Sequence, residues 1–255
     1  MTTRGGFGSF WTAWHFLTVV PLPVKVPFEL ERMGRSALFF PVIGLILGAI
    51  LVAFDAAAAP FFPRPIVNLL LMLLLVLITG GLHLDGFADT VDGLAGGATP
   101  AERLEIMRDG RIGALAVVGL FFLLTFKFLA LSALPGEVRW RGLLAFPFVG
   151  RSVMVPAAYF SRYPRPEGLG KSFVGQVPPP ALAGAAAIFL GGMIFLFRMK
   201  GLSAAVLLLA AAFPAVRWMA RKTGGITGDH LGALGEGAEL LFLILLYSLY
   251  RPELI

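Results

Sequence analysis

The 255-residue chain contains no cysteine. This absence excludes disulfide bonds, thiol nucleophiles and thiolate metal ligands. Only three histidines are present, so we do not expect a metal site made of histidine alone. Charged residues form 14% of the chain, against about 25% in soluble domains. The first residues, MTTRGGFGSFWTAWHF, lack the basic start, apolar core and cleavage site of a signal peptide.

Hydrophobic residues make up 58% of the chain, and the mean hydropathy is +0.85. A helix needs about 20 apolar residues to cross a bilayer, and such segments recur along the sequence. We therefore predict an all-α, polytopic integral membrane helical bundle that forms a single domain, 1–255. A short aromatic stretch, 7–20, predicts an interfacial N-terminal helix. Seven transmembrane segments are expected, at 36–54, 65–82, 112–134, 141–160, 180–197, 202–218 and 237–252.

Basic residues are divided unevenly between the two sides of this predicted bundle. Thirteen of the 21 lysines and arginines lie in the N-terminal region, in 83–111, in 161–179 or in 217–236. The positive-inside rule places these segments in the cytoplasm. Most acidic residues lie on the same side, which favours an enzyme site over a transport path through the bilayer. The net charge of +6 then reflects cytoplasmic loops and phosphorylated substrates, and no nucleic-acid partner is expected.

The stretch GGLHLDGFADTVDGLAGG, 80–97, places three carboxylates after an apolar run. On a helix, Asp85, Asp89 and Asp92 share one face because they are spaced i, i+4, i+7. Three close carboxylates repel one another and need a cation, and oxygen ligands favour Mg²⁺, Mn²⁺ or Ca²⁺ over zinc. A polar helix end at the lipid headgroups is the simpler alternative, but three aspartates flanked by glycines favour a metal site. His83 is a candidate general base beside it.

Arginines follow in RDGRIG, 108–113, and in the apolar segment FPFVGRSVMVP. Arginine side chains suit phosphate oxygens, and a charge within a membrane segment is usually functional. The alternatives are a positive-inside pair for Arg108 and Arg111, and an ion pair with a buried acid for Arg151. The stretch SRYPRPEGLGKSF resembles a flexible phosphate-binding loop, although it is not a P-loop. We expect five side chains to bind phosphate: Arg108, Arg111, Arg151, Arg162 and Lys171.

A second acidic stretch, GGITGDHLGALGEGAE, occupies 224–239. Asp229 and Glu236 are seven residues apart, as are Asp85 and Asp92, and we favour chance over an internal repeat as the reason. Asp229 is a candidate acceptor for a hydroxyl proton, and Asp229 with Glu236 is a candidate second metal site. Lys127 is interpreted as a snorkelling or packing residue without a functional role.

These residues together predict Mg²⁺-assisted chemistry on a phosphorylated or diphosphate substrate at one membrane face. On this ground alone, a CDP-alcohol phosphotransferase, a membrane prenyltransferase and a transporter remain open. The transporter is the alternative of a different functional class. It is distinguished by experiment, because a transporter would release no product of phosphoryl transfer.

Two stretches, GGLHLDGFADTVDGL and RDGRIGALAVV, resemble motifs of the cobalamin 5′-phosphate synthase, or adenosylcobinamide-GDP ribazoletransferase, family. Family members look like TGGLHLDGLADTADGL followed by (K/R)D(S/G)RIG. Further matches occur in order at FPFVGRSVMV, PEGLGKSF and GGITGDHLGALGEGAE. FLTVVPLPV is similar to the family's FLTRLPVP, although Val19 stands where arginine is common, and Gly110 stands where serine is frequent. The resemblance covers about residues 7–240.

The resemblance implies an Mg²⁺-dependent, multi-pass enzyme of the prokaryotic inner membrane whose active site faces the cytoplasm. Its substrates would be adenosylcobinamide-GDP and α-ribazole or α-ribazole 5′-phosphate, and its products adenosylcobalamin or its 5′-phosphate and GMP. In that reading Asp85, Asp89 and Asp92 bind Mg²⁺ around the diphosphate, and Asp229 or His83 takes the hydroxyl proton. The resemblance leaves open a homo-oligomer or an association with other enzymes of cobalamin assembly.

Overall fold

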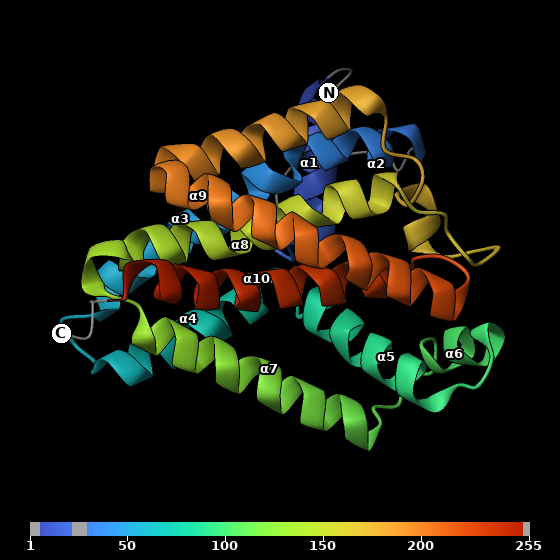
Figure 1. The fold of residues 1–255 in the computed structure, drawn as a ribbon, viewed down its shortest axis with the longest axis horizontal. Coiled ribbons are helices and arrows are strands. Elements are labelled where there is room, and N and C mark those ends of the chain that lie inside the picture. The colour runs from blue at the N-terminus through green and yellow to red at the C-terminus, as the bar shows by residue number, and fades with distance from the viewer. Residues whose placement is uncertain (1–5, 22–29, 252–255) are drawn as a thin grey trace.

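The structure, a computed structural model, describes residues 6–21 and 30–251, and this part of the chain is helical with no strand. The all-α prediction is thus confirmed. Short 3₁₀ helices, η1 (Ala37–Phe39) and η2 (Leu169–Ser172), connect longer elements. Figure 1 shows the arrangement of the α-helices. They are α1 (Gly6–Leu17), α2 (Leu30–Ser36), α3 (Phe40–Ala58), α4 (Arg64–Thr79), α5 (Leu82–Gly96), α6 (Pro100–Ile106), α7 (Ala114–Ala133), α8 (Gly136–Tyr159), α9 (Pro179–Thr223) and α10 (Gly228–Tyr250).

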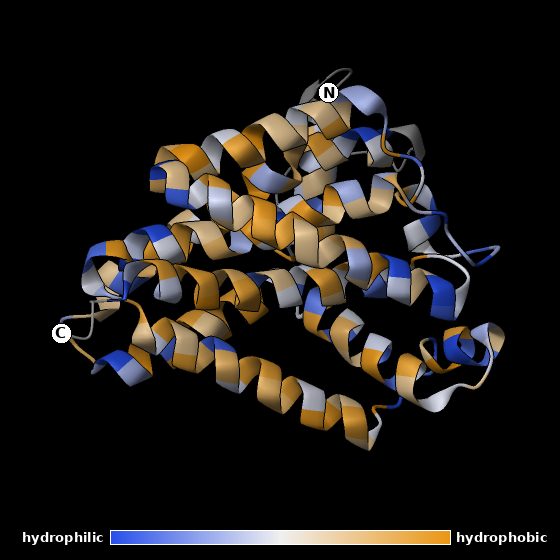
Figure 2. Cartoon of the chain, in the orientation of Figure 1, coloured by the Kyte–Doolittle hydropathy of each residue, from blue (hydrophilic) through white to orange (hydrophobic). Residues whose placement is uncertain are grey.

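Several of these helices are suited to a bilayer. Among the described residues, five helical stretches are long and apolar enough to span it: Arg32–Ala58, α7, α8, α9 and α10. The number rises to six if α4 and α5, which meet at a bend of 89°, count as one broken span. Apolar residues fill the middle of the bundle and polar residues gather toward its two ends (Figure 2). The chain is therefore a multi-pass membrane protein.

The long helix α9 is two helices in one. Its backbone breaks at Arg198, where φ is 54° and ψ is −135°, and its two halves run back along each other (Figure 1). The halves correspond to the expected segments 180–197 and 202–218. Each of the seven expected segments therefore overlaps a helix or half-helix, although α4, with 16 residues, is shorter than the roughly 20 needed to span alone.

The largest difference from the sequence-based boundaries lies in α10, which begins at Gly228 rather than at residue 237. The expected loop therefore contains the first turns of a helix, capped by Thr227. Asp229 and Glu236 lower the local hydropathy, and for that reason the apolar pattern starts late. The stretch 83–111, also expected as a loop, holds most of α5 and all of α6.

Helix α8 forms the centre of the bundle and packs against α3, α9 and α10. Two glycines of α3 allow its close approach to α8. A Cβ atom added at Gly48 would lie 2.1 Å from the carbonyl oxygen of Leu144, and one at Gly44 would lie 2.6 Å from the Cα of Phe148. Small residues at helix contacts serve this purpose in membranes, where backbones must approach closely to gain packing energy.

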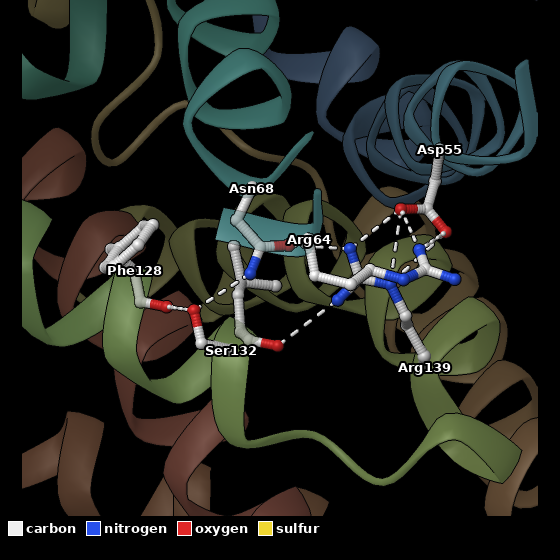
Figure 3. Close-up of polar contacts among 7 residues, drawn as sticks. Asp55, Arg64, Asn68, Phe128, Ser132 and Arg139 are labelled. Atoms are coloured by element: carbon white, nitrogen blue, oxygen red, sulfur yellow. Dashed lines mark hydrogen bonds and ion pairs between the residues drawn. The ribbon is translucent and has the colours of Figure 1, made fainter. Parts of the chain in front are cut away.

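Near the end of α3 and the start of α8, Asp55 joins three helices through ion pairs (Figure 3). Its carboxylate accepts hydrogen bonds from Arg139 of α8 at 2.7 Å and from Arg64 of α4 at 3.2 Å. Arg139 also donates to Asn68 Oδ1 at 2.6 Å, and Asn68 donates to Ser132 of α7 at 2.9 Å. This cluster connects α3, α4, α7 and α8.

The two arginines on Asp55 allow a matched test of burial. The Arg139 side chain is 10% exposed and the Arg64 side chain 58% exposed. Arg139→Gln leaves a mostly buried carboxylate short of a partner, and we expect a loss of about 3 kcal/mol. Arg64→Gln removes an exposed pair and should cost less than about 1 kcal/mol. Thermal unfolding in detergent measures both, and equal shifts in Tm would contradict this interpretation.

Candidate functional site

Two glycines turn the chain from α4 into α5. Gly80 and Gly81 both have left-handed backbones, with φ of 63° and 69°, which glycine adopts without strain. A Cβ atom on Gly80 would also lie 2.5 Å from Cγ1 of Val19. After the turn, α5 leaves at 89° to α4 and carries the three aspartates of the sequence motif. The helix that their spacing predicts is therefore present.

The two acidic stretches meet where α5 crosses α10. A Cβ atom at Gly86 of α5 would lie 2.9 Å from the Cα of Asp229, and one at Gly232 of α10 would lie 3.2 Å from the Cα of His83. Each motif thus supplies a glycine that admits the backbone of the other. The crossing brings Asp229 close enough to Asp89 for their charges to repel, as Asp85 also repels Asp89, while Arg165 attracts it.

The Asp92 carboxylate binds backbone N–H groups near the start of α7. Its Oδ2 accepts a hydrogen bond from the backbone N–H of Gly113 at 2.6 Å, and its Oδ1 accepts one from that of Ala116 at 3.1 Å. The carboxylate therefore satisfies free N–H groups at the amino end of α7. In residues 6–21 and 30–251, no three His, Asp or Glu side chains are placed as a ready-made metal site. Metal binding by Asp85, Asp89 and Asp92 stays a prediction.

The side chain of Asp229 is held from two sides. Thr227 Oγ1 donates a hydrogen bond to its Oδ2 at 3.1 Å, and Arg165 Nη1 lies 3.6 Å from the same atom. Arg165 also donates from Nη2 to the carbonyl oxygen of Leu104, while its buried Nε has no partner in the described residues. His230 is buried and its Nδ1 accepts the N–H of Thr227, completing a capping box. Sequence analysis placed Arg165 in a basic loop, 161–179, but did not predict it as a site residue.

Four charged side chains form a cluster inside the bundle, which we call the buried ion cluster: Lys127, Arg151, Glu236 and Glu239. Lys127 Nζ of α7 lies 2.5 Å from Glu236 Oε2 and 2.6 Å from Glu239 Oε2, both on α10. Arg151 of α8 hydrogen-bonds the other oxygen of Glu239. The interpretation of Lys127 as a snorkelling residue is therefore wrong, because its ammonium group is buried between Glu236 and Glu239. Arg151 pairs with a buried acid, Glu239, which was the alternative to phosphate binding. Glu236 pairs with Lys127 in this cluster and does not lie beside Asp229.

The other four side chains expected at phosphates are exposed, three in loops and Lys171 in η2. Arg108 donates to the carbonyl oxygen of Glu167, Arg162 to that of Gly224 and Lys171 to that of Pro166. Arg111 binds Asp109 at 2.5 Å, and this hydrogen bond lowers the pKa of the Asp109 carboxyl. These side chains gather at the same end of the bundle as α6, and their phosphate-binding roles stay predictions.

Two cavities flank the crossing of α5 and α10. The larger has a volume of about 700 Å³ and includes Asp85, Thr79 and His15 in its walls. The smaller has a volume of about 250 Å³ and includes His83, Arg165 and Asp229. Phe16 and Leu82 contribute to both cavities and so lie between them. The larger cavity thus reaches Asp85, and the smaller one reaches Asp229.

In a comparison with known proteins, the family model described as cobalamin-5-phosphate synthase matches residues 9–247. The chain belongs to this family. It is 38% identical over 240 residues to a protein of Geotalea daltonii named adenosylcobinamide-GDP ribazoletransferase, covering 94% of this chain and 97% of that one. Proteins of the same name from Acetivibrio thermocellus and Escherichia coli K12 are also 38% identical, over 239 and 244 residues. These alignments cover 91% and 93% of this chain and 94% and 98% of the relatives.

No solved structure matches the chain. The region matched by the family model, 9–247, contains both acidic stretches, the loop with Arg165 and the residues that line both cavities. Membership of the family thus applies to the whole candidate site.

The crossing of the two helices predicts a position-dependent effect of alanine. Gly86→Ala places a Cβ atom against the backbone of Asp229 and should cost about 1–3 kcal/mol by overpacking. Gly237→Ala on α10 is the control, because nothing lies within 4 Å of its added Cβ and alanine favours a helix. Thermal unfolding in detergent measures both variants. An unchanged Tm for Gly86→Ala would show that the helices are farther apart than described.

Proposed function

We propose that the protein joins adenosylcobinamide-GDP to α-ribazole, or to α-ribazole 5′-phosphate, and releases GMP. The products are adenosylcobalamin or its 5′-phosphate. One observation carries the proposal: two acidic stretches of a member of the synthase family meet at one helix crossing, between two cavities. A transferase with two substrates needs such an arrangement, because both must reach the same reacting phosphorus.

The reaction requires one bond to phosphorus to form and one to break. A ribose hydroxyl oxygen of α-ribazole attacks the phosphorus that carries the cobinamide, and the P–O bond to the bridging oxygen breaks. GMP leaves with that oxygen, and the hydroxyl proton passes to a base. We assign the base to Asp229, because it lies in the wall of the smaller cavity and Thr227 fixes one of its oxygens.

Arg165 is the cation best placed for the diphosphate. Its guanidinium contacts Asp229, acts on the charge of Asp89, and retains a buried Nε without a partner among the described residues. A phosphate oxygen between the carboxylates and Arg165 would supply that partner and form a charge-assisted hydrogen bond. Arginine then offsets the negative charge that the leaving GMP gains.

Magnesium is the cofactor that these residues fit. Asp85 and Asp89 are one helical turn apart, their charges repel, and no thiolate is available. Mg²⁺ is commonly held by one or two carboxylates together with substrate phosphates and water, so it does not need a third protein ligand. When bound, the ion would neutralise charge on the diphosphate. Asp85 and Asp89 would hold the ion beside the larger cavity, whose wall includes Asp85.

The direction of the site follows from the charges of the loops. The candidate site lies at the end of the bundle that carries the basic loops with Arg108, Arg162 and Lys171. By the positive-inside rule we propose that this end faces the cytoplasm of a prokaryotic cell, with the bundle in the inner membrane. Both nucleotide substrates would then reach the site from the cytoplasm.

A direct assay tests the proposal. Protein purified in detergent is mixed with adenosylcobinamide-GDP and α-ribazole 5′-phosphate, with Mg²⁺ or with EDTA, and both products are followed by chromatography. We expect equal amounts of GMP and cobalamin phosphate, only in the presence of Mg²⁺. Folded protein that forms neither product under these conditions would disprove the proposed function.

Replacement of one carboxylate tests the metal assignment. We expect Asp89→Asn to lower kcat by about 100-fold or more, because the amide neither binds Mg²⁺ well nor replaces the charge. The Mg²⁺ concentration at half-maximal rate should rise as well. Glu105→Gln on the neighbouring α6 is the control, since this exposed side chain lies outside both cavities. Normal Mg²⁺-dependent turnover by Asp89→Asn would exclude Asp89 as a ligand.

The two arginines of one loop separate the structural from the sequence-based assignment. Arg165 contacts Asp229, whereas Arg162 is exposed and donates to the carbonyl oxygen of Gly224. Arg165→Gln should lower kcat/KM by about 100-fold through lost phosphate contacts, and Arg162→Gln by less than about threefold. The same assay measures both variants. The reverse order would restore Arg162 as the phosphate ligand.

A further inference from the structure

The smaller cavity has walls suited to a flat, mostly apolar group. Leu82 comes from α5, Met154 from α8 and Leu231 from α10, and the side chains of Met154 and Leu231 are buried. Phe16 of α1 and Phe173 complete the wall, with ring centroids 6.2 Å apart. Phe173 stacks in turn on Phe40, at 4.8 Å and an interplanar angle of 8°. This aromatic stack offers a flat apolar surface to a planar ring.

A single polar group stands among these apolar walls. His83 lines the cavity, is only 4% exposed, and its Nε2 has no hydrogen-bond partner in the described part of the chain. A buried ring nitrogen without a partner loses the hydrogen bond that water would give. His83 therefore brings to this wall an imidazole nitrogen whose hydrogen-bonding capacity the described residues do not use.

The remaining lining residues make one end of the cavity polar. Arg165 and Asp229 lie there, together with Gly168, Gly170 and Tyr163 of the loop. A Cβ atom at Gly170 would lie 2.7 Å from the Tyr163 ring and 3.0 Å from the backbone nitrogen of Gly228, so this glycine closes the loop onto the start of α10. The cavity thus combines an apolar body with the residues proposed to handle the hydroxyl and the phosphate.

We propose that this cavity binds the bicyclic base of α-ribazole, a benzimidazole nucleoside, and that His83 hydrogen-bonds the ring nitrogen not joined to ribose. This inference rests on the proposed function. The apolar rings of the base contact Met154, Leu231 and the aromatic stack. The ribose then extends to the polar end, where its hydroxyl meets Asp229. Met154 and Leu231 set the size of base that the protein accepts.

The guanine of adenosylcobinamide-GDP is the competing occupant, and the cavity fits it poorly. Guanine presents an exocyclic amine, a ring N–H and three acceptors, O6, N7 and N3, each of which needs a partner. With Asp229 assigned to the hydroxyl and Arg165 to the phosphate, the imidazole of His83 is the side chain left for the base, so guanine would bury polar groups unsatisfied. A benzimidazole has one free ring nitrogen and otherwise apolar edges. Its requirements match what His83 and its neighbours supply.

Filling the cavity distinguishes the two occupants. We expect Met154→Phe to raise KM for α-ribazole 5′-phosphate by about tenfold or more, and to leave KM for adenosylcobinamide-GDP within about twofold. The control is Leu241→Phe, which makes the same kind of change in a separate apolar cavity of about 240 Å³ between α9 and α10. A rise in KM for adenosylcobinamide-GDP alone would place guanine there. No change in either KM would leave the cavity outside both binding sites and also overturn the proposal.

Two further variants keep the test decisive if Met154→Phe does not fold. Met154→Ala widens the cavity and should raise kcat/KM for a riboside with a tricyclic base by about tenfold relative to α-ribazole. His83→Leu should raise KM for α-ribazole by about tenfold, while His83→Gln, which keeps a hydrogen-bond donor, recovers most of the affinity. Unchanged base preference in Met154→Ala, or equal effects of the two His83 variants, would contradict the assignment.

The inference and the proposed function fail differently. Binding of α-ribazole alone to wild-type and His83→Leu protein is measured by equilibrium dialysis, without the second substrate. Binding that depends on His83, in a protein that releases no GMP, would retain the cavity assignment and disprove the synthase reaction. Normal GMP release, together with α-ribazole binding that does not depend on His83 or Met154, would retain the synthase reaction and disprove the cavity assignment.

Discussion

The close crossing of α5 and α10 is the constraint on which the candidate site depends. The two helices touch backbone to backbone at Gly86 and Gly232, and side chains there would separate them. Asp85 and Asp89 act on each other within α5, and the crossing adds the charge of Asp229 from α10. The crossing thus holds like charges together, which is unfavourable until a cation or Arg165 offsets them. Arg165, which lies 3.6 Å from Asp229, supplies part of that positive charge within the protein itself.

The buried ion cluster explains how α10 keeps its position against that repulsion. Glu236 and Glu239 pair with Lys127 of α7 and Arg151 of α8, so two acids meet two bases in an apolar interior. Sliding α10 by one turn would leave these charges unpaired, and unpaired charges in a bilayer are costly. The same α10 carries Asp229 two turns before Glu236. Lys127 and Arg151 also act electrostatically on His83, so the cluster and the smaller cavity are neighbours.

The sequence predicted the type of structure, the positions of the apolar segments and the two acidic stretches, because hydropathy and spacing are local properties. It placed the start of α10 too late, since Asp229 and Glu236 look like loop residues until their partners are known. Spacing put Asp92 on the face of Asp89, but no local signal shows that the amino end of α7 takes the Asp92 carboxylate. Choosing Arg165 over Arg162 likewise needs the fold of the loop. One sequence signal did point to the buried ion cluster. Lys127 and Arg151 lie within apolar segments, and a charged residue in such a position indicates a buried acidic partner.

The division of polar groups between the two cavities bears on how water is kept from the reaction. Asp85 faces the larger, open cavity, while Asp229 and His83 face the smaller one, whose walls are aromatic and aliphatic. A hydroxyl that reaches Asp229 from the smaller cavity would arrive with an apolar base behind it, and that base would occupy space otherwise filled by water. Water is the competing nucleophile for any activated diphosphate, so exclusion from this side favours transfer over hydrolysis. In the proposed reaction, the apolar character of the smaller cavity would thus favour transfer as well as recognition of the base.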